Sequence, residues 1–371
     1  MSVRTTSTGQ RTLLIDLGDV GKSVKGVARV QTSLAPQLAA LAPERYEAVC
    51  TPVGKEIIDG LDLGIPIHVV RNAPGTVWEQ VVLPTVATRL RASALYAHRE
   101  CGALWGPRLV LHVPEDPEIR WRREPTSDAR ELARRRYSRT MMNRSLARST
   151  VVASTNATLR DLEENHHLAP GRATVVPLGV DLDLFRPGRS VPDPRPYFFH
   201  LASSDERDRT ALLVRGFARY RLDRPTGARL VIGGALGSQA TEIERLITDL
   251  NIAEDTDLLG RVSDDELADR YAGAVATVQA SPDEGFGLQA LEAMACGSLV
   301  ISTPAEAVRE VVGEGVVLWA EPEFEAIADA LRAASDGVDL SVRATTVNRQ
   351  RAEHFSWGRA ARSLHALLTA H

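Results

Sequence analysis

Residues 281–302, SPDEGFGLQALEAMACGSLVIS, carry the structural signal from which the rest of the chain can be interpreted. Gly285 and Gly287 form a stretch with little side-chain bulk. Apolar residues then recur at helical spacing, at Leu288, Leu291, Met294 and Ala295. This pattern predicts a glycine-containing loop that opens a buried helix.

Two carboxylates, Glu284 and Glu292, bracket this loop and helix. Glu292 lies four residues after Leu288, so it shares a helix face with apolar residues, where a buried charge is costly. No Lys or Arg occurs between Arg270 and Arg309. Either an Arg from elsewhere in the fold pairs with Glu292, or a ligand hydroxyl donates to it while the N–H groups of the helix start face an anion. A nucleotide sugar, which carries hydroxyls and phosphates, fits the second alternative.

Length and composition describe an ordinary globular protein. The 371 residues suffice for two domains, and 44% hydrophobic with 25% charged residues is typical of soluble chains. A net charge of −4 indicates no preference for nucleic acid. The first dozen residues are polar and no apolar run reaches about 18 residues, so we expect a cytoplasmic protein.

Apolar strand candidates alternate with helical or loop segments along both halves of the chain, which predicts an α/β fold with parallel sheets. A helix with a Val27, Val30, Leu34 stripe follows the first strand. The predicted strands lie at residues 12–17, 46–53, 65–70, 94–98, 108–113 and 149–155, then at 196–202, 228–234, 256–261, 274–281 and 298–303. Residues 175–196, rich in Pro and Gly, predict an extended linker between the halves.

The 281–302 segment closely resembles the E-x7-E signature of the retaining glycosyltransferases of family 4, which have the GT-B fold. The linker VVPLGVDLDLFRPG resembles that family's PxGVDxxxF segment, and FSWGRAARSLHALL its terminal helix. The resemblance implies two Rossmann-like domains facing across a cleft. Residues 1–185, completed by helix 356–371, would form the acceptor-side domain, and 186–355 the nucleotide-sugar-binding domain.

The same resemblance implies the activity and the donor site. The enzyme would transfer a sugar from a nucleoside diphosphate sugar to an acceptor hydroxyl with retention of configuration, without a protein nucleophile. Glu284 would contact the donor sugar and act in catalysis, and Glu292 would hold the ribose. The loop residues Gly285, Phe286, Gly287 and Leu288 would surround the donor, with Val262 near the base.

Phosphate binding is where the chain departs from the family. Arg207 stands where the family has a Lys, whereas Ala202 or Ser203 replaces the usual Arg, so Arg209 would compensate. A solvated surface loop is the alternative for these charges. Gly26, in KGVAR, resembles the glycine at the start of the family's first long helix, where backbone amides approach the donor phosphate.

Polar residues at strand ends in the first half are acceptor-side and catalytic candidates. His112 ends a strand, where open parallel sheets bind ligands, and the family often has a His here that touches the donor sugar. His98, Glu115 and Asp116 are predicted on the acceptor side. For each of these residues, a structural hydrogen-bond network is the alternative.

No metal site or cofactor is predicted. Asp181 and Asp183 form a D-x-D pattern, but in the linker, where we interpret it as structural. Arg207, Arg209 and helix N-termini would then neutralise the leaving diphosphate. The basic amphipathic helix near residues 130–148 either contacts an anionic membrane peripherally, at its inner face, or presents a solvated Arg-rich surface.

Two rival functions are compatible with these residues. A nucleotide-sugar 2-epimerase shares the GT-B architecture and needs no acceptor. A non-catalytic partner of another glycosyltransferase would explain the loss of the usual phosphate-binding Arg. For a transferase, the acceptor classes are a polysaccharide, a lipid-linked sugar or glycolipid, and a small natural-product molecule.

Overall fold

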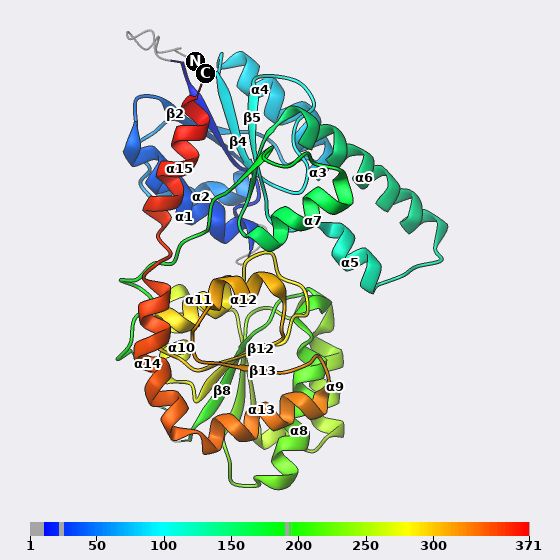
Figure 1. The fold of residues 1–371 in the computed structure, drawn as a ribbon, viewed down its shortest axis with the longest axis vertical. Coiled ribbons are helices and arrows are strands. Elements are labelled where there is room, and N and C mark those ends of the chain that lie inside the picture. Colours follow the sequence, from blue (N-terminus) through cyan, green and yellow to red (C-terminus); the bar gives the residue numbers. More distant parts are fainter. Residues whose placement is uncertain (1–10, 22–25, 190–192, 194, 371) are drawn as a thin grey trace. The chain divides into compact units, whose positions relative to one another are not determined.

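The computed structural model describes residues 11–21, 26–189, 193 and 195–370. The chain divides into two compact units, Met1–Gly179 with Trp357–His371, and Val180–Ser356 (Figure 1). Each unit is a parallel sheet with helices packed on it, so the predicted α/β fold with two Rossmann-like domains is confirmed.

The first unit contains a seven-stranded sheet of order β3-β2-β1-β4-β5-β6-β7. Its strands are β1 (Leu13–Leu17), β2 (Tyr46–Cys50), β3 (Ile67–Val69), β4 (Ala94–His98), β5 (Arg108–Val113), β6 (Thr150–Ala153) and β7 (Ala173–Val175). Its helices are α1 (Val27–Leu41), α2 (Pro52–Gly60), α3 (Gly75–Val77), the π-helix η1 (Trp78–Val82), α4 (Leu83–Arg89), α5 (Pro117–Arg123), α6 (Ala129–Arg148), α7 (Asn156–His166) and α15 (Trp357–Thr369). The strand order reverses between β1 and β4.

The second unit contains a six-stranded sheet of order β10-β9-β8-β11-β12-β13. Its strands are β8 (Tyr197–Leu201), β9 (Arg229–Gly233), β10 (Thr256–Gly260), β11 (Ala276–Gln279), β12 (Val300–Ser302) and β13 (Val317–Trp319). The helices are α8 (Thr210–Asp223), α9 (Ala240–Asp249), α10 (Asp264–Gly273), α11 (Leu288–Ala295), α12 (Glu306–Val312), α13 (Phe324–Asp336) and α14 (Val338–Ala352), with short 3₁₀ turns η2 (Glu206–Asp208), η3 (Gly237–Gln239) and η4 (Ala253–Asp255). Here the order reverses between β8 and β11.

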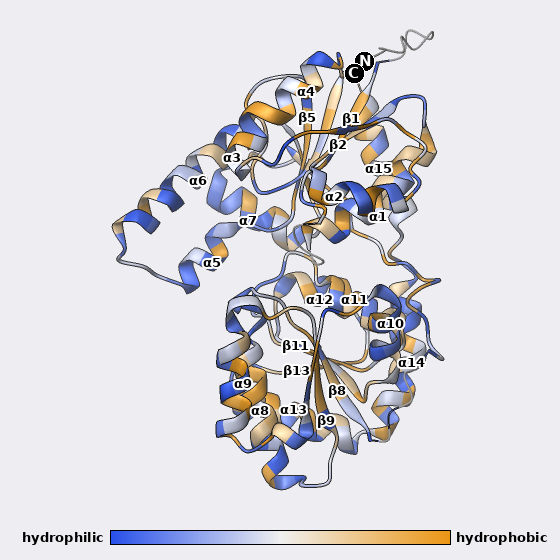
Figure 2. Ribbon diagram, turned by 180° about the vertical axis from the view of Figure 1, so that it is seen from behind, coloured by the Kyte–Doolittle hydropathy of each residue, from blue (hydrophilic) through white to orange (hydrophobic). Residues whose placement is uncertain are grey.

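Every predicted strand is present, and two edge strands were not predicted. β7 and β13 have three residues each and lie at sheet edges, where their residues are mostly half-buried or exposed and give no continuous apolar run. The inner strands β1, β4 and β8 are buried on both faces, as helices on both sides of a parallel sheet require. Figure 2 accordingly shows hydrophobic residues along β1 and β5, whereas α6 is largely hydrophilic.

The predicted domain boundary at residue 185 falls a few residues after the division seen in the structure. Val180–Phe185 packs with the second unit because Arg349 donates to the Phe185 carbonyl at 2.7 Å and the Phe185 ring lies 6.1 Å from that of Tyr271. The helix α15 returns to the first unit. There the Arg108 guanidinium donates to the Leu367 carbonyl at 2.8 Å.

The apolar stripe predicted on α6 does not face a core along most of its length. Leu132 and Tyr137 are about half exposed, and only residues near the end of the helix are buried: Met142, Ser145 and Leu146. Figure 1 shows the amino-terminal part of α6 extending away from the sheet. The helix therefore presents its first turns to solvent, with the arginines that they carry.

A buried amide on α14 joins three elements of the second unit. Asn348 is fully buried, accepts from the Val316 N–H at 2.6 Å, and donates to the carbonyls of Ser298 at 2.8 Å and Val316 at 3.1 Å. It thus joins Val316, the residue before β13, to the turn after α11.

We expect Asn348→Ala to lower the free energy of unfolding by on the order of 3 kcal/mol, because it leaves three buried backbone groups without a partner. Urea denaturation of the variant and the parent would measure this. Gln350→Ala, at an exposed site on the same helix, is the control and should change stability by less than about 0.5 kcal/mol. Equal effects of the two substitutions would contradict the assigned role of Asn348.

Candidate active site

The second unit has a topological switch point between β8 and β11, which pair in parallel with Phe198 opposite Ala276. In open parallel sheets, ligands bind outside the carboxyl ends of the strands at this point. The loop after β8 contains Arg207 and Arg209, and the loop after β11 contains Glu284. The fold therefore brings the predicted phosphate-binding and sugar-binding segments to one sheet edge.

The predicted glycine loop and buried helix are both present. Gly287 is the N-cap of α11 with φ 85° and ψ 47°, a left-handed conformation, and a Cβ there would lie 3.0 Å from Val308. Only glycine fits this position without strain. Phe286 is buried against the Phe355 ring at 5.8 Å, which holds the loop in place. The first N–H groups of α11, starting at Leu288, therefore point toward the sheet edge.

Glu284 and Glu292 occupy different environments. Glu284 is half-buried in the loop beside the buried Gly285, whereas Glu292 lies on α11 with 6% exposure. Burial and, next, the Glu292 carboxylate raise the pKa of the Cys296 thiol, one turn further along, to about 12. The charge of Glu292 thus acts within a desolvated part of the helix, as the position beside Leu288 predicted.

The two arginines differ in how the fold holds them. Arg207 lies in η2, and its Nε donates to Asp205 Oδ2 at 2.8 Å while Asp205 Oδ1 accepts from its backbone N–H at 3.0 Å. Arg209 is exposed, with φ 52°, and its side chain has no hydrogen bond or ion pair with the part of the chain that is described. A phosphate would compete with Asp205 for Arg207, but it would meet Arg209 without such competition.

Val262 follows β10 at the same edge of the sheet. It is half-buried, and its side chain lies 3.4 Å from the place of a Cβ on Gly233, at the end of β9. Gly234 donates to the Gly260 carbonyl at 2.6 Å, so the loops after β9 and β10 are joined. Backbone rather than side chains lines this part of the edge.

In the first unit, two predicted histidines lie against each other at the ends of β4 and β5. His112 is fully buried, with Nδ1 3.0 Å from the Tyr96 hydroxyl and Nε2 2.9 Å from Ser154 Oγ. Its ring meets that of His98 edge-on at 4.7 Å. Burial lowers the pKa of both imidazoles, that of His98 to about 3 with Arg99 as the second cause. Both rings are therefore neutral.

The two rings differ in what remains available to a ligand. Both nitrogens of His112 are engaged by protein hydroxyls, so direct contact with a sugar would require one of these bonds to break. His98 Nδ1 is buried and lacks a hydrogen-bond partner within the described residues. His98 Nδ1 can therefore accept or donate a further hydrogen bond, whereas both nitrogens of His112 already have partners.

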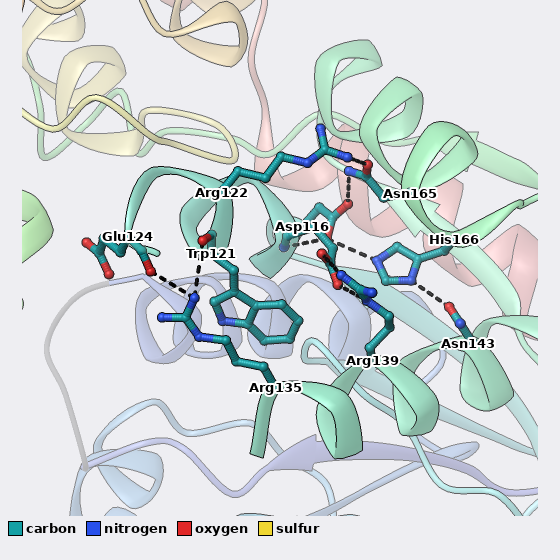
Figure 3. A network of polar contacts seen from close by, with 10 residues as sticks. Asp116, Trp121, Arg122, Glu124, Arg135, Arg139, Asn143, Asn165 and His166 are labelled. Carbon is teal, nitrogen blue, oxygen red and sulfur yellow. Dashed lines mark hydrogen bonds and ion pairs between the residues drawn. The ribbon is translucent and has the colours of Figure 1, made fainter. Parts of the chain in front are cut away.

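Asp116, predicted on the acceptor side, takes part in a network of structural contacts (Figure 3). It is the N-cap of α5, accepting from the Glu118 N–H at 2.9 Å. Its oxygens also contact His166 Nε2 at 3.0 Å and Asn165 Nδ2 at 2.7 Å. With 4% exposure it has no free surface for an acceptor, because it joins α5 to α7. The prediction for its neighbour Glu115, which is half-buried, stays a prediction.

A buried charge cluster lies at the β1/β4 switch point around Arg99, which follows His98 and was, like it, an acceptor-side candidate, whereas its carboxylate partners were not predicted. Arg99 forms ion pairs with Asp16 and Asp19 and lies 3.8 Å from Glu79. The π-helix η1 presents Trp78, whose Nε1 donates to Asp16 at 3.0 Å, and Glu79 to this cluster. Asp16 inside an otherwise apolar strand was the signal in the sequence, since a buried carboxylate requires a cation.

The remaining predictions concern Gly26 and the linker. Gly26 is the exposed N-cap of α1 with φ 58° and ψ −120°, and the preceding Lys25 lies outside the described residues. Asp181 accepts from the N–H groups of Asp183 and Leu184 at 3.0 Å each, which agrees with a structural D-x-D. Across the described residues, no cluster of three or more His, Cys, Asp or Glu is arranged to hold a metal ion.

Helix length and polarity bear on membrane contact. Within the residues that the structure describes, none of the helices combines the length and apolar character needed to span a bilayer.

Comparison with known families and proteins matches the second unit most directly. Residues 183–351 match the family described as Glycosyl transferases group 1. D-inositol 3-phosphate glycosyltransferase from Geodermatophilus obscurus is 32% identical over 237 residues, 59% of this chain and 52% of that protein. A GDP-mannose-dependent alpha-(1-6)-phosphatidylinositol dimannoside mannosyltransferase from Mycobacterium tuberculosis is 32% identical over 56% of this chain and 55% of its own. The chain thus spans about half the length of the curated relatives it matches.

Solved structures extend the likeness over both units. WaaG, a glycosyltransferase involved in lipopolysaccharide biosynthesis, superimposes with a TM-score of 0.77 at 13% identity, covering 97% of this chain and 100% of that one. Anabaena Alr3699/HepE in complex with UDP-glucose gives 0.74 at 17% identity, covering 97% and 100%. These similarities show that the chain has the GT-B fold.

The Glu79 carboxyl predicts a pH dependence of stability. Burial raises its pKa from 4.5 to about 7, against the attraction of Arg99. The folded state therefore holds this proton more tightly than the unfolded state, and the Glu79 contribution to the free energy of unfolding falls as the pH rises from about 4.5 to 7. Glu79→Gln abolishes this dependence. The free energy of unfolding of this variant minus that of the parent should rise by up to roughly 3 kcal/mol between about pH 4.5 and 7, and then level off. Urea denaturation between pH 4.5 and 8 measures the difference, and a constant difference would contradict it.

Proposed function

We propose that the protein is a retaining glycosyltransferase of family 4 that transfers a sugar from a nucleoside diphosphate sugar to an acceptor hydroxyl. The observation that carries the proposal is the meeting of two loops at the β8/β11 switch point. One supplies Arg207 and Arg209, and the other supplies Glu284 and the start of α11. Cations, a helix N-terminus and carboxylates at one edge suit a ligand that joins phosphates to hydroxyls.

Each group at the edge has a distinct proposed role. The N–H groups after Gly287 and the two arginines bind the diphosphate, and Arg207 exchanges Asp205 for it. Glu292, buried on α11, accepts hydrogen bonds from the ribose, and Glu284 from the transferred sugar. The base lies along the backbone near Val262, where few side chains intervene.

The proposed reaction needs no nucleophile from the protein. The acceptor hydroxyl attacks the anomeric carbon on the face from which the diphosphate leaves, and a leaving phosphate oxygen takes the hydroxyl proton. Positive charge from the arginines and from the α11 N-terminus stabilises the diphosphate as its bond breaks, so we propose that no metal is required. In the first unit, we propose His98 as a ligand contact positioned by His112, because its Nδ1 has no hydrogen-bond partner among the described residues.

The names of the relatives suggest which donors and acceptors to test first. One relative is named as GDP-mannose-dependent, and one structural neighbour was solved with UDP-glucose, so GDP-mannose and UDP-glucose are the first donors to test. The acceptor is a polyol or sugar, either free, in a polysaccharide or on a lipid. A lipid-linked acceptor would suit the exposed basic turns of α6, because we propose that these turns contact the cytoplasmic face of the inner membrane peripherally.

The rival functions are less well supported. The matching family and the relatives named above are glycosyltransferases, which favours transfer over 2-epimerisation. A non-catalytic partner would not need a left-handed Gly287 that keeps the α11 start open beside two arginines. Consumption of the donor only when an acceptor is present would distinguish transfer from both rivals.

Glu292→Gln should weaken binding of a nucleoside diphosphate by roughly ten- to a hundredfold, because a charge-assisted hydrogen bond contributes about 1.5–3 kcal/mol. Isothermal calorimetry with UDP and GDP measures this. Glu314→Gln, exposed in the turn after α12, is the matched control and should bind as the parent does. Unchanged affinity in Glu292→Gln would remove Glu292 from the donor site.

Glu284→Ala should act on turnover rather than on nucleotide affinity. Losing the orientation of the transferred sugar costs on the order of a hundredfold in rate, while the diphosphate and ribose contacts persist. Equal losses in rate and in diphosphate affinity would contradict this role.

The parent protein should keep its activity with each donor in EDTA, because we propose that no metal is required. Loss of activity in EDTA that manganese restores would contradict metal independence.

A further inference from the structure

Gln279, the last residue of β11, is a buried side chain whose hydrogen bonds are missing. It is 2% exposed, and neither its Oε1 nor its Nε2 has a hydrogen-bond partner within the described part of the chain. Its backbone is well fixed, because its carbonyl accepts from the Thr303 N–H at 3.2 Å. Leaving both ends of a buried amide unsatisfied is costly, so such a group in a native protein requires an explanation.

The direction of this side chain follows from the strand. Side chains alternate between the two faces of a sheet, so Gln279 shares a face with Thr277. The Thr277 hydroxyl lies 3.2 Å from that of Ser298, which follows α11 directly. Val278, between them, packs in the core on the opposite face.

Gln279 therefore faces α11, two residues closer than Thr277 to the carboxyl edge of the sheet. The loop after β11 leads into α11 at this edge, so the amino-terminal half of the helix lies there, whereas Ser298 marks its other end. The amide thus lies beneath the amino-terminal end of the helix that carries Glu292.

The chemistry of the amide selects the kind of ligand group. Gln279 offers two donor hydrogens and one acceptor oxygen, and both ends lack a partner. A phosphate oxygen accepts only and would leave Oε1 unsatisfied. A pair of neighbouring hydroxyls donates to Oε1 and accepts from Nε2 together.

We propose that Gln279 is a specificity residue that binds a vicinal diol of the donor, beneath the amino-terminal half of α11. This rests on the proposed function, since it assumes a nucleoside diphosphate sugar at that edge. Two parts of such a donor carry a vicinal diol, the ribose and the transferred sugar. The protein then keeps an amide that costs stability in the free state because the diol satisfies it in the complex.

Gln279→Met tests this with a side chain of similar size that has no amide. Removing an unsatisfied amide should raise the temperature of unfolding of the free protein by roughly 2 °C or more, while donor affinity falls about tenfold. Thr277→Val is the matched control on the same strand and face. Its hydroxyl already has a partner, so its loss should lower stability slightly and leave affinity unchanged.

Calorimetry uses whichever of UDP and GDP binds the parent, and then UDP-glucose or GDP-mannose. Loss of affinity for the diphosphate itself assigns the diol to the ribose, and loss for the nucleotide sugar alone assigns it to the transferred sugar. Retained affinity for both ligands overturns the inference. So does a lower unfolding temperature in Gln279→Met, because it shows that the amide has a partner in the free protein. A parent that binds none of the four ligands contradicts the proposed function itself.

Discussion

Parallel pairing of β8 with β11 is the constraint on which the candidate donor site depends. The two strands are far apart in sequence, so the loops that follow them can meet only because the strand order reverses at this pair. Each loop alone is incomplete, since the loop after β8 supplies the arginines and the loop after β11 supplies Glu284 and the start of α11. The pairing places opposite charges at one edge, which is what a ligand with phosphates and hydroxyls requires.

The helix α11 can serve this edge because its other end is held elsewhere. Adjacent residues of α14 act on it, since Arg349 donates to the Ala295 carbonyl at 3.0 Å and Asn348 donates to the Ser298 carbonyl at 2.8 Å. These bonds satisfy carbonyls at the carboxyl end, where the helix dipole favours a cation. The other end of α11, with the N-cap Gly287, follows the loop after β11 at the sheet edge. A mobile helix would lose this orientation, so the long-range contacts of α14 contribute to the site without touching it.

Sequence patterns predicted the elements that are long and apolar, and the loop that needs glycine. The strand LLIDL and the loop around Gly287 carry their structural reasons in their own residues. The edge strand β13 does not, because Asn348 from a distant helix holds it. The apolar stripe of α6 shows a related limit of sequence patterns. Periodicity shows that a face is apolar, but not whether anything packs on it, and Leu132 is half exposed.

Site residues were hardest to judge where tertiary partners decide their role. Asp116 and His112 resemble site residues in sequence, but both are occupied, the first by a helix cap and His166 and the second by two hydroxyls. His98 and Gln279, also at the carboxyl ends of strands, are buried with polar atoms that have no partner within the described residues. A protein gains nothing in stability from such atoms. Because these atoms lie at sheet edges where ligands bind, a hydrogen-bond partner that arrives with the substrate explains them better. Whether the buried polar atoms of a side chain have partners in the protein therefore separates binding residues from structural ones more sharply than residue type does.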